Sequence, residues 1–164
     1  MRRLQKITAL IISLTGGFFS GTSARAAPPD FTETYADAAH GFSFKYPPTL
    51  RIHASQQDAT AIIVARNAAK TIGFQIHIKP IGGTDRAITP TRIARDMPGL
   101  AIRGPQRLRI PGAGLALAFY ATEQNFGESF QVWFIRQGRL YQLSSYAPHD
   151  ALVRGVLATW TFTK

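Results

Sequence analysis

Aromatic and polar side chains alternate strictly between Phe42 and Tyr46, where the chain reads FSFKY. Successive side chains of a β-strand point to opposite faces, so this alternation predicts a strand with three aromatic rings on one face. Pro47 and Pro48 follow at once, and because proline has no backbone N–H, the strand should end there or lie at a sheet edge. We therefore expect Phe42, Phe44 and Tyr46 to lay one row of rings into a core.

Three further segments in the first half of the chain have strand-like patterns. Residues 49–54 can return beside the opening strand, and residues 60–66 (TAIIVAR) form a β-branched run that favours an interior strand. Residues 71–81 alternate again and end at Gly82-Gly83. On one face of this last strand lie Ile72, Phe74, Ile76 and Ile78, and on the other lie Gln75, His77 and Lys79.

A short helix is predicted over residues 89–97, within TPTRIARDMPG. Thr89 can cap it, Pro90 suits the first helical position, and the Pro-Gly pair after Met97 ends it. Strands are then predicted over residues 107–110 and 115–123, on either side of the turn PGAG. The second of these is apolar on both faces, which indicates a central strand covered by a helix or another layer.

The segment FQVWFIRQGRLYQLSSY predicts a hairpin with a two-residue turn at Gln137-Gly138. The implied cross-strand pairs are Phe134 with Tyr141, Val132 with Leu143, and Trp133 with Gln142. Apolar residues at four-residue spacing then predict a helix near residues 149–158, beginning at Pro148, before a last strand at 160–162. This order of elements predicts an α+β fold, an antiparallel sheet layered between helices as an α/β/α sandwich.

The first 26 residues have the pattern of a signal peptide. A basic start and a mostly apolar run over residues 7–21 precede the small residues Ala24 and Ala26. We expect cleavage near Ala26, an extended leader over residues 27–30, and one domain over residues 31–164. The predicted location is therefore the periplasm or the exterior of the cell.

Two alternatives concern how this segment is used. A retained membrane anchor is disfavoured, because the apolar run of about 15 residues is shorter than the roughly 18 to 20 needed to span a bilayer. Arg2-Arg3 and Arg25 are compatible with the twin-arginine export route, but the residues around them match that motif poorly, so the general secretory route is favoured.

The 164-residue chain has no cysteine, which excludes a disulfide framework and a lipid-modified N-terminal cysteine. Four of its 19 basic residues and none of its nine acidic residues precede the expected cleavage point, so the net charge falls from +10 to +6 on cleavage. A basic exported domain favours anionic partners, such as an acidic envelope protein, an envelope polymer or lipid headgroups. Nucleic acid is not an expected partner outside the cytoplasm.

The opening strand GFSFKYP, residues 41–47, resembles the start of domains in the PsbP-like superfamily. The late hairpin GRLYQLSSYAP, the helix after it and the terminal TWTFT are similar to the end of the same domains. The resemblance implies an antiparallel sheet layered between helices. It implies no single activity, because relatives include photosystem II extrinsic proteins, a Ran-binding nuclear factor and many bacterial envelope proteins. No metal-binding residue of the photosynthetic relatives has a matching motif here.

The sequence contains no clear catalytic or metal-binding motif, and we assign no catalytic residue, metal or cofactor. His40, His53, His77 and His149 are scattered singly, without the spacing typical of zinc sites. His77 is the strongest of them, because it shares a strand face with Gln75 and Lys79 that could line a groove. Ser144 or Ser145 with His149 and Asp150 contain the residue types of a hydrolase triad, but neighbours in sequence seldom meet in that geometry.

Arginine is concentrated between residues 86 and 109, at positions Arg86, Arg92, Arg95, Arg103, Arg107 and Arg109. Guanidinium groups bind carboxylates and phosphates with two hydrogen bonds, so the segment is a candidate surface for an anionic partner. A solvated face with ordinary surface charge is the alternative. Trp133 is core if a helix covers it and a partner anchor if it is exposed.

Three hypotheses follow. The first is an exported binding or accessory domain without catalytic activity that uses the arginine-rich surface. The second is a hydrolase or metal-dependent enzyme with a histidine-lined cleft, and the third is a structural part of a larger envelope assembly.

Overall fold

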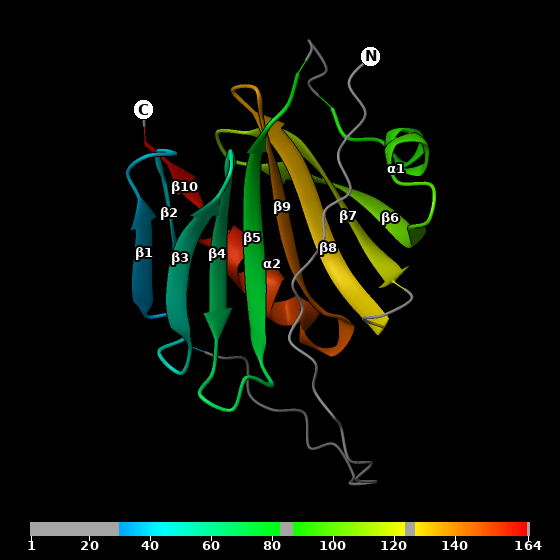
Figure 1. The fold of residues 1–164 in the computed structure, drawn as a ribbon. Helices are drawn as coiled ribbons and strands as arrows, with labels where there is room; N and C mark the ends of the chain where they lie inside the picture. Colours follow the sequence, from blue (N-terminus) through cyan, green and yellow to red (C-terminus); the bar gives the residue numbers. More distant parts are fainter. Residues whose placement is uncertain (1–29, 83–86, 124–126, 164) are drawn as a thin grey trace, which may run out of the picture.

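The computed structural model describes residues 30–82, 87–123 and 127–163, and Figure 1 shows their arrangement. The proposed signal peptide, Gly83 and Arg86 lie outside these ranges. The elements in chain order are β1 (Glu33–Asp37), β2 (Phe42–Tyr46), β3 (Arg51–Gln57), β4 (Thr60–Arg66), β5 (Gly73–Pro80), α1 (Pro90–Asp96), β6 (Ala101–Ile110), β7 (Gly114–Glu123), β8 (Gly127–Arg136), β9 (Arg139–Tyr146), the 3-10 helix η1 (Ala147–His149), α2 (Asp150–Ala158) and β10 (Thr161–Phe162).

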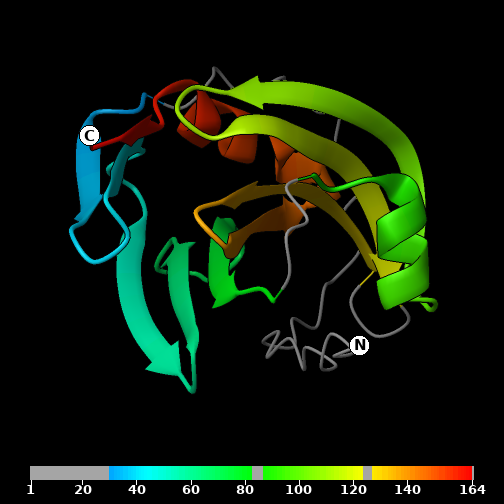
Figure 2. The same cartoon turned by 90° about the horizontal axis from the view of Figure 1, so that it is seen from above.

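The strands form two antiparallel sheets. One has three strands in the order β1-β2-β10, and the other has seven in the order β3-β4-β5-β9-β8-β7-β6. Viewed from above, the strands of the larger sheet follow a curved path (Figure 2). Every strand pair is antiparallel, which confirms the predicted sheet type.

The expectation that residues 49–54 pair with the opening strand is wrong. Both neighbours of β2 are already taken, by β1 and β10, and β3 pairs with β4 along its whole length. The reason lies at Pro47-Pro48, where β2 ends and the Leu50 N–H donates to the Pro47 carbonyl at 3.1 Å. This turn leads the chain out of the small sheet and into the large one.

Helices lie against opposite faces of the seven-stranded sheet, which confirms the layered α+β fold. The inner face packs on α2 and the small sheet around residues such as Phe74, Val132 and Val156. The outer face packs on α1, where Ile93 meets Leu117, Phe119, Trp133 and Leu140. The helix caps agree with the prediction, since Thr89 Oγ1 accepts a hydrogen bond from the Arg92 backbone N–H and Pro90 is the first helical residue.

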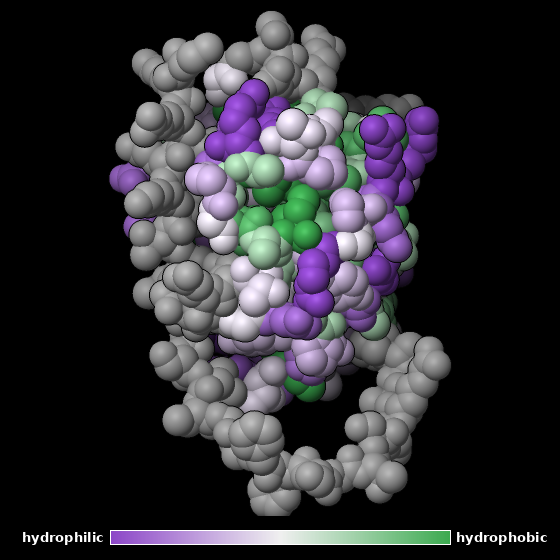
Figure 3. All heavy atoms as spheres, turned by 90° about the vertical axis from the view of Figure 1, so that its right-hand side faces the viewer, coloured by the Kyte–Doolittle hydropathy of each residue, from purple (hydrophilic) through white to green (hydrophobic). Residues whose placement is uncertain are grey.

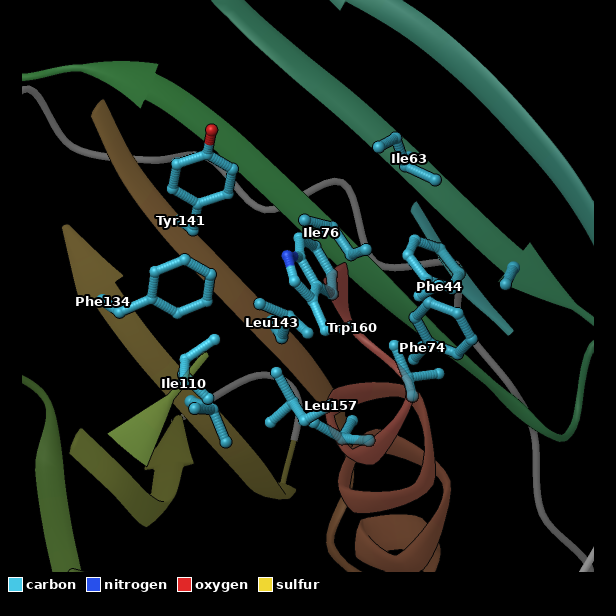
Figure 4. Packing of buried hydrophobic residues seen from close by; sticks show 14 of the residues in the cluster. Phe44, Ile63, Phe74, Ile76, Ile110, Phe134, Tyr141, Leu143, Leu157 and Trp160 are labelled. Atoms are coloured by element: carbon cyan, nitrogen blue, oxygen red, sulfur yellow. The ribbon is translucent and has the colours of Figure 1, made fainter. Parts of the chain in front are cut away.

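The opening strand places its rings in the inner core. Phe42 and Phe44 are buried and stack on Trp160 with centroid distances of 4.5 and 5.3 Å. Tyr46 is half-buried at the end of the row, whereas Lys45 is exposed. In Figure 4, Trp160 lies among side chains from the sheets and α2, including Ile76, Leu143 and Leu157. The predicted row of rings therefore joins the two sheets.

The predicted hairpin has the predicted register. Gln137 and Gly138 form its two-residue turn with positive φ angles of 49° and 71°. Phe134 pairs with Tyr141, Val132 with Leu143, and Trp133 with Gln142. Trp133 is only 4% exposed beneath α1, so it belongs to the outer core.

Gly155 of α2 packs closely against the ring of Phe31, which lies at the start of the domain. A Cβ atom built on Gly155 would lie 2.1 Å from the Phe31 ring, which no packed structure tolerates. We expect Gly155→Val to lower the free energy of unfolding by about 2 kcal/mol, because it displaces a ring that packs against the inner core. Chemical denaturation measures this.

A double variant tests the cause of that loss. Phe31→Ala in the Gly155→Val background should recover part of the stability, because the clash is then absent. Ala158→Val, an exposed change on the same helix, should have little effect. Equal losses in Gly155→Val and Ala158→Val would contradict this explanation.

Candidate functional site

Three of the six arginines are held by carboxylates of this chain. On α1, Arg92 and Arg95 donate to Asp96 at 3.3 and 3.0 Å, and Arg103 of β6 pairs with Glu128 of β8. The hydrogen bond from Arg95, and then that from Arg92, keeps the pKa of Asp96 below its usual value. These three guanidinium groups are therefore already engaged.

Arg107 and Arg109 differ from Arg92, Arg95 and Arg103. Both side chains are exposed, and neither forms an ion pair or hydrogen bond in the part of the chain that the structure describes. Arg107 pairs across the sheet with Leu117 and Arg109 with Leu115, so both lie on the outer face. They form a pair of unengaged cations two residues apart on one strand.

β6 is an edge strand of the seven-stranded sheet. Its ladder with β7 is interrupted between Arg103 and Gln106, where Gly104 has a positive φ of 55°. A bulge and Pro105 oppose pairing with another strand in this half. From Gln106 to Ile110 the ladder is regular, and this half carries the free arginines.

An apolar side chain adjoins this pair. Leu115, opposite Arg109, is 51% exposed, one of two large hydrophobic residues with such exposure in the described chain. Figure 3, which views the side of α1 and β6, shows hydrophilic groups around a central hydrophobic area. We call Arg107, Arg109 and Leu115 the β6 edge surface.

The arginine-rich segment is thus not one patch among the residues described. Arg103 pairs with Tyr120, whose side chain lies on the inner face, so Arg103 lies on the face opposite to Arg107 and Arg109. Arg92 and Arg95 belong to the helix layer above the outer face. Among the described arginines of this segment, only Arg107 and Arg109 are two adjacent guanidinium groups without a carboxylate partner.

Gln75, His77 and Lys79 lie on the outer face of β5, beyond the part that α1 covers. Across the ladder, His77 lies opposite Gln142 and Gln75 opposite Ser144. On the other side of β9, Ser144 lies opposite Gln131 of β8. The sequence pattern predicted the first three residues and missed the glutamines, because their distance along the chain hides the pairing. We call these residues the outer polar strip: Gln75, His77, Lys79, Gln131, Gln142 and Ser144.

Burial disfavours the charged forms of the two basic residues of the strip. Burial, and then the charge of Lys79, lower the pKa of His77 below 6.5. Burial lowers the pKa of Lys79 from 10.5 to about 8. Both groups therefore destabilise the folded state when they are protonated.

This predicts how stability changes with pH. Between about pH 8 and pH 10 the unfolded chain keeps the Lys79 proton that the folded chain has lost, so the free energy of unfolding should rise with pH. Below pH 6.5 the unfolded chain gains the His77 proton first, so stability should fall as the pH drops. Above pH 10 the raised pKa values of Tyr35 and Tyr141 act in the opposite direction.

Urea denaturation at intervals across this range measures the effect. In Lys79→Met, the free energy of unfolding should no longer rise between pH 8 and pH 10. It should still fall as the pH drops below 6.5. A rise of equal size in the parent and in Lys79→Met would contradict the assignment to Lys79.

The two buried glutamines of the strip differ in their hydrogen bonds. Gln131, 6% exposed, accepts from Trp133 Nε1 at 2.9 Å and donates to Ser129 Oγ at 3.0 Å. Gln142, 7% exposed, has its Oε1 buried without a hydrogen-bond partner. A buried acceptor without a donor costs about 1–3 kcal/mol, so Gln142 is a local weakness of the sheet.

We therefore expect opposite effects from the same substitution. Gln142→Met should raise the free energy of unfolding by about 1 kcal/mol, because it removes an unsatisfied acceptor at similar volume. Gln131→Met should lower it by about 1–2 kcal/mol, because it leaves the Trp133 N–H without an acceptor. Chemical denaturation of the two variants checks this, and a loss in both would contradict it.

The described histidines do not assemble a metal site. In the ranges that the structure describes, no group of three or more His, Cys, Asp or Glu side chains could hold an ion. His53 is exposed on β3, and His149 lies in η1. His40 pairs with Asp37, its Nδ1 lying 2.8 Å from Asp37 Oδ2.

Ser145 and Asp150, both near His149, are engaged in other contacts. Ser145 Oγ donates towards the carbonyls of Tyr146 and His149, both at 3.3 Å. Asp150 Oδ2 accepts from Tyr120 Oη at 2.9 Å and from Arg154 Nε at 3.2 Å. These contacts give the residues structural roles at the start of α2.

None of the described helices is long and apolar enough to cross a membrane.

Comparison with known proteins identifies the fold. Neither the family models nor the curated proteins compared with this sequence gave a match. The solution structure of cyanobacterial PsbP (CyanoP) from Synechocystis sp. PCC 6803 is similar, with a TM-score of 0.53 over 87% of this chain and 97% of that chain. The chain has the PsbP fold. This confirms the resemblance of the opening strand and the C-terminal segment. At 11% identity, the similarity to CyanoP shows the PsbP fold alone.

Proposed function

We propose that this PsbP-fold protein is an exported binding or accessory domain without catalytic activity, which contacts an anionic partner through the β6 edge surface. The observation that carries the proposal is the state of Arg107 and Arg109. They are exposed, adjacent on one strand face and unpaired within the described chain, whereas Arg92, Arg95 and Arg103 are held by carboxylates.

The spacing of the pair suits a carboxylate- or phosphate-rich partner. Side chains two residues apart on a strand lie on the same face, so both guanidinium groups are presented on the same side of the sheet. Each guanidinium can make two hydrogen bonds to such a group. Leu115 adds an apolar contact beside them, and interfaces combine such contacts with charged rims.

The expected location supports an envelope partner. The N-terminal sequence predicts export, and the absence of cysteine suits a domain stabilised by packing alone. An acidic envelope protein, an envelope polymer and anionic lipid headgroups share the required chemistry.

Photo-crosslinking in intact cells tests the proposal. A photoreactive amino acid in place of the exposed Leu115 should capture a defined species, and Arg107→Gln/Arg109→Gln in the same background should abolish the capture. Arg51→Gln/Arg66→Gln is the matched control, because it removes the same charge from the outer face at the other end of the sheet. Equal capture by both double variants would overturn the proposal.

A further inference from the structure

A cleft opens between the two sheets, at the side where β1 lies over β3 and β4. Its volume is about 420 Å³, within the range of small-molecule sites. Tyr35 and Asp37 pair with Phe44 and Phe42, whose rings face the inner core, so both side chains point from the small sheet towards the large one. The opposite wall is the inner face of β3 and β4.

Small and apolar side chains keep this cleft open. Its floor is Ala61 and Ile63 of β4, both buried. Its other small side chains are those of Ala54, which pairs with Ile63, and of Ala38 and Ala39 in the turn after β1. An alanine in place of a larger residue leaves space between two layers that elsewhere pack on aromatic rings.

The wall of the cleft contains one hydrogen-bonded polar pair, Asp37 and His40. The Asp37 carboxylate accepts from the His40 backbone N–H at 3.0 Å and lies 2.8 Å from His40 Nδ1. Since a carboxylate only accepts, Nδ1 carries the proton, and in the neutral ring Nε2 is an acceptor. Both side chains are largely buried, at 15% and 11% exposed, so the imidazole is held in one tautomer and one orientation.

The other polar groups are neutral. Tyr35 supplies a hydroxyl that can donate or accept, and Gln56 supplies an amide whose Nε2 donates to the Asp58 carbonyl at 3.2 Å and whose Oε1 can accept. Among the residues that the structure describes, no lysine or arginine lines the cleft, and its one carboxylate is already hydrogen-bonded twice to His40. This is unlike the β6 edge surface, because nothing here would compensate a charged ligand.

We propose that this cleft is a binding site for a neutral ligand that carries hydroxyl groups on an apolar frame, such as a hexose unit. One hydroxyl donates to His40 Nε2, which Asp37 orients, while Gln56 and Tyr35 bind its neighbours. The apolar face of the ring lies on Ala61 and Ile63. The site is separate from the β6 edge surface, so either can fail without the other.

Nuclear magnetic resonance titration of the purified protein tests this with N-acetylglucosamine as the probe. We expect chemical-shift changes in the His40 ring and at Ala54 and Ala61. Glucuronate, the charged counterpart, should bind at least ten-fold more weakly. Ala54→Trp should abolish binding by filling the cleft. Ala68→Trp, an exposed change on the turn after β4, should bind as the parent does.

A second variant addresses recognition. His40→Phe keeps a ring of similar shape but removes the acceptor, so it should weaken binding at least ten-fold while Ala54 and Ala61 keep their positions in the spectrum of the free protein. Absence of shifts in the cleft with the probe at its solubility limit would overturn the proposal. So would equal binding of glucuronate, or binding by Ala54→Trp as tight as that of the parent.

Discussion

Replacing Phe44 by alanine should lower the free energy of unfolding by about 3–5 kcal/mol. Phe44 is 1% exposed, and its ring lies 5.3 Å from Trp160 and 5.8 Å from Phe74. It thus connects the small sheet with both the C-terminal segment and the large sheet. Truncation removes this buried ring and leaves a cavity that the neighbouring rings of Trp160 and Phe74 cannot fill.

A loss of this size is a large part of the stability of an ordinary domain, and this chain has no disulfide to offset it. Thermal and chemical denaturation measure the change. Lys45→Ala is the matched control, because Lys45 is next in the strand but exposed, and it should melt as the parent does. If Phe44→Ala were as stable as Lys45→Ala, the opening strand would not anchor the core.

Local patterns in the sequence were sufficient to predict most strands, because alternation reports directly which face of a strand is buried. The row from Phe42 to Tyr46 and the hairpin around Gln137-Gly138 both have the predicted form. The assignment of β2 to a separate small sheet was not predictable in this way. It depends on pairing with β10, more than 110 residues away, as in the contact between Ser43 and Thr161.

β1 was missed for a related reason. Its sequence, ETYAD, has a single aromatic residue, and all five of its side chains are half-buried or exposed. Only the ladder with β2 identifies it as a strand. Its pairing also brings Asp37 into position to hold His40, a contact that the histidine count alone could not reveal.

The candidate surface was predictable in composition but not in geometry. The run of arginines indicated anionic partners, yet sequence distance does not show that Asp96 engages Arg92 and Arg95 or that Glu128 reaches Arg103. The bulge after Arg103 also changes the face on which later residues lie. The structure therefore narrows the candidate cations to Arg107 and Arg109.

The second large effect is expected at this pair. Arg107→Gln/Arg109→Gln should bind a polyanion about ten-fold more weakly, since each exposed contact between an arginine and an anion contributes up to about 1 kcal/mol. The effect should shrink as salt is added, because exposed charges are screened. Stability should not change, since neither side chain makes a hydrogen bond or ion pair within the described ranges.

The most direct measurement of the central claim is the salt concentration at which each purified double variant leaves a heparin column. Arg107→Gln/Arg109→Gln and Arg51→Gln/Arg66→Gln have the same net charge, so a purely global charge effect would lower both elution points equally. We predict that the β6 variant elutes at clearly lower salt than the control variant, which should remain close to the parent. Equal elution of the two variants would contradict the assignment of anion binding to the β6 edge surface.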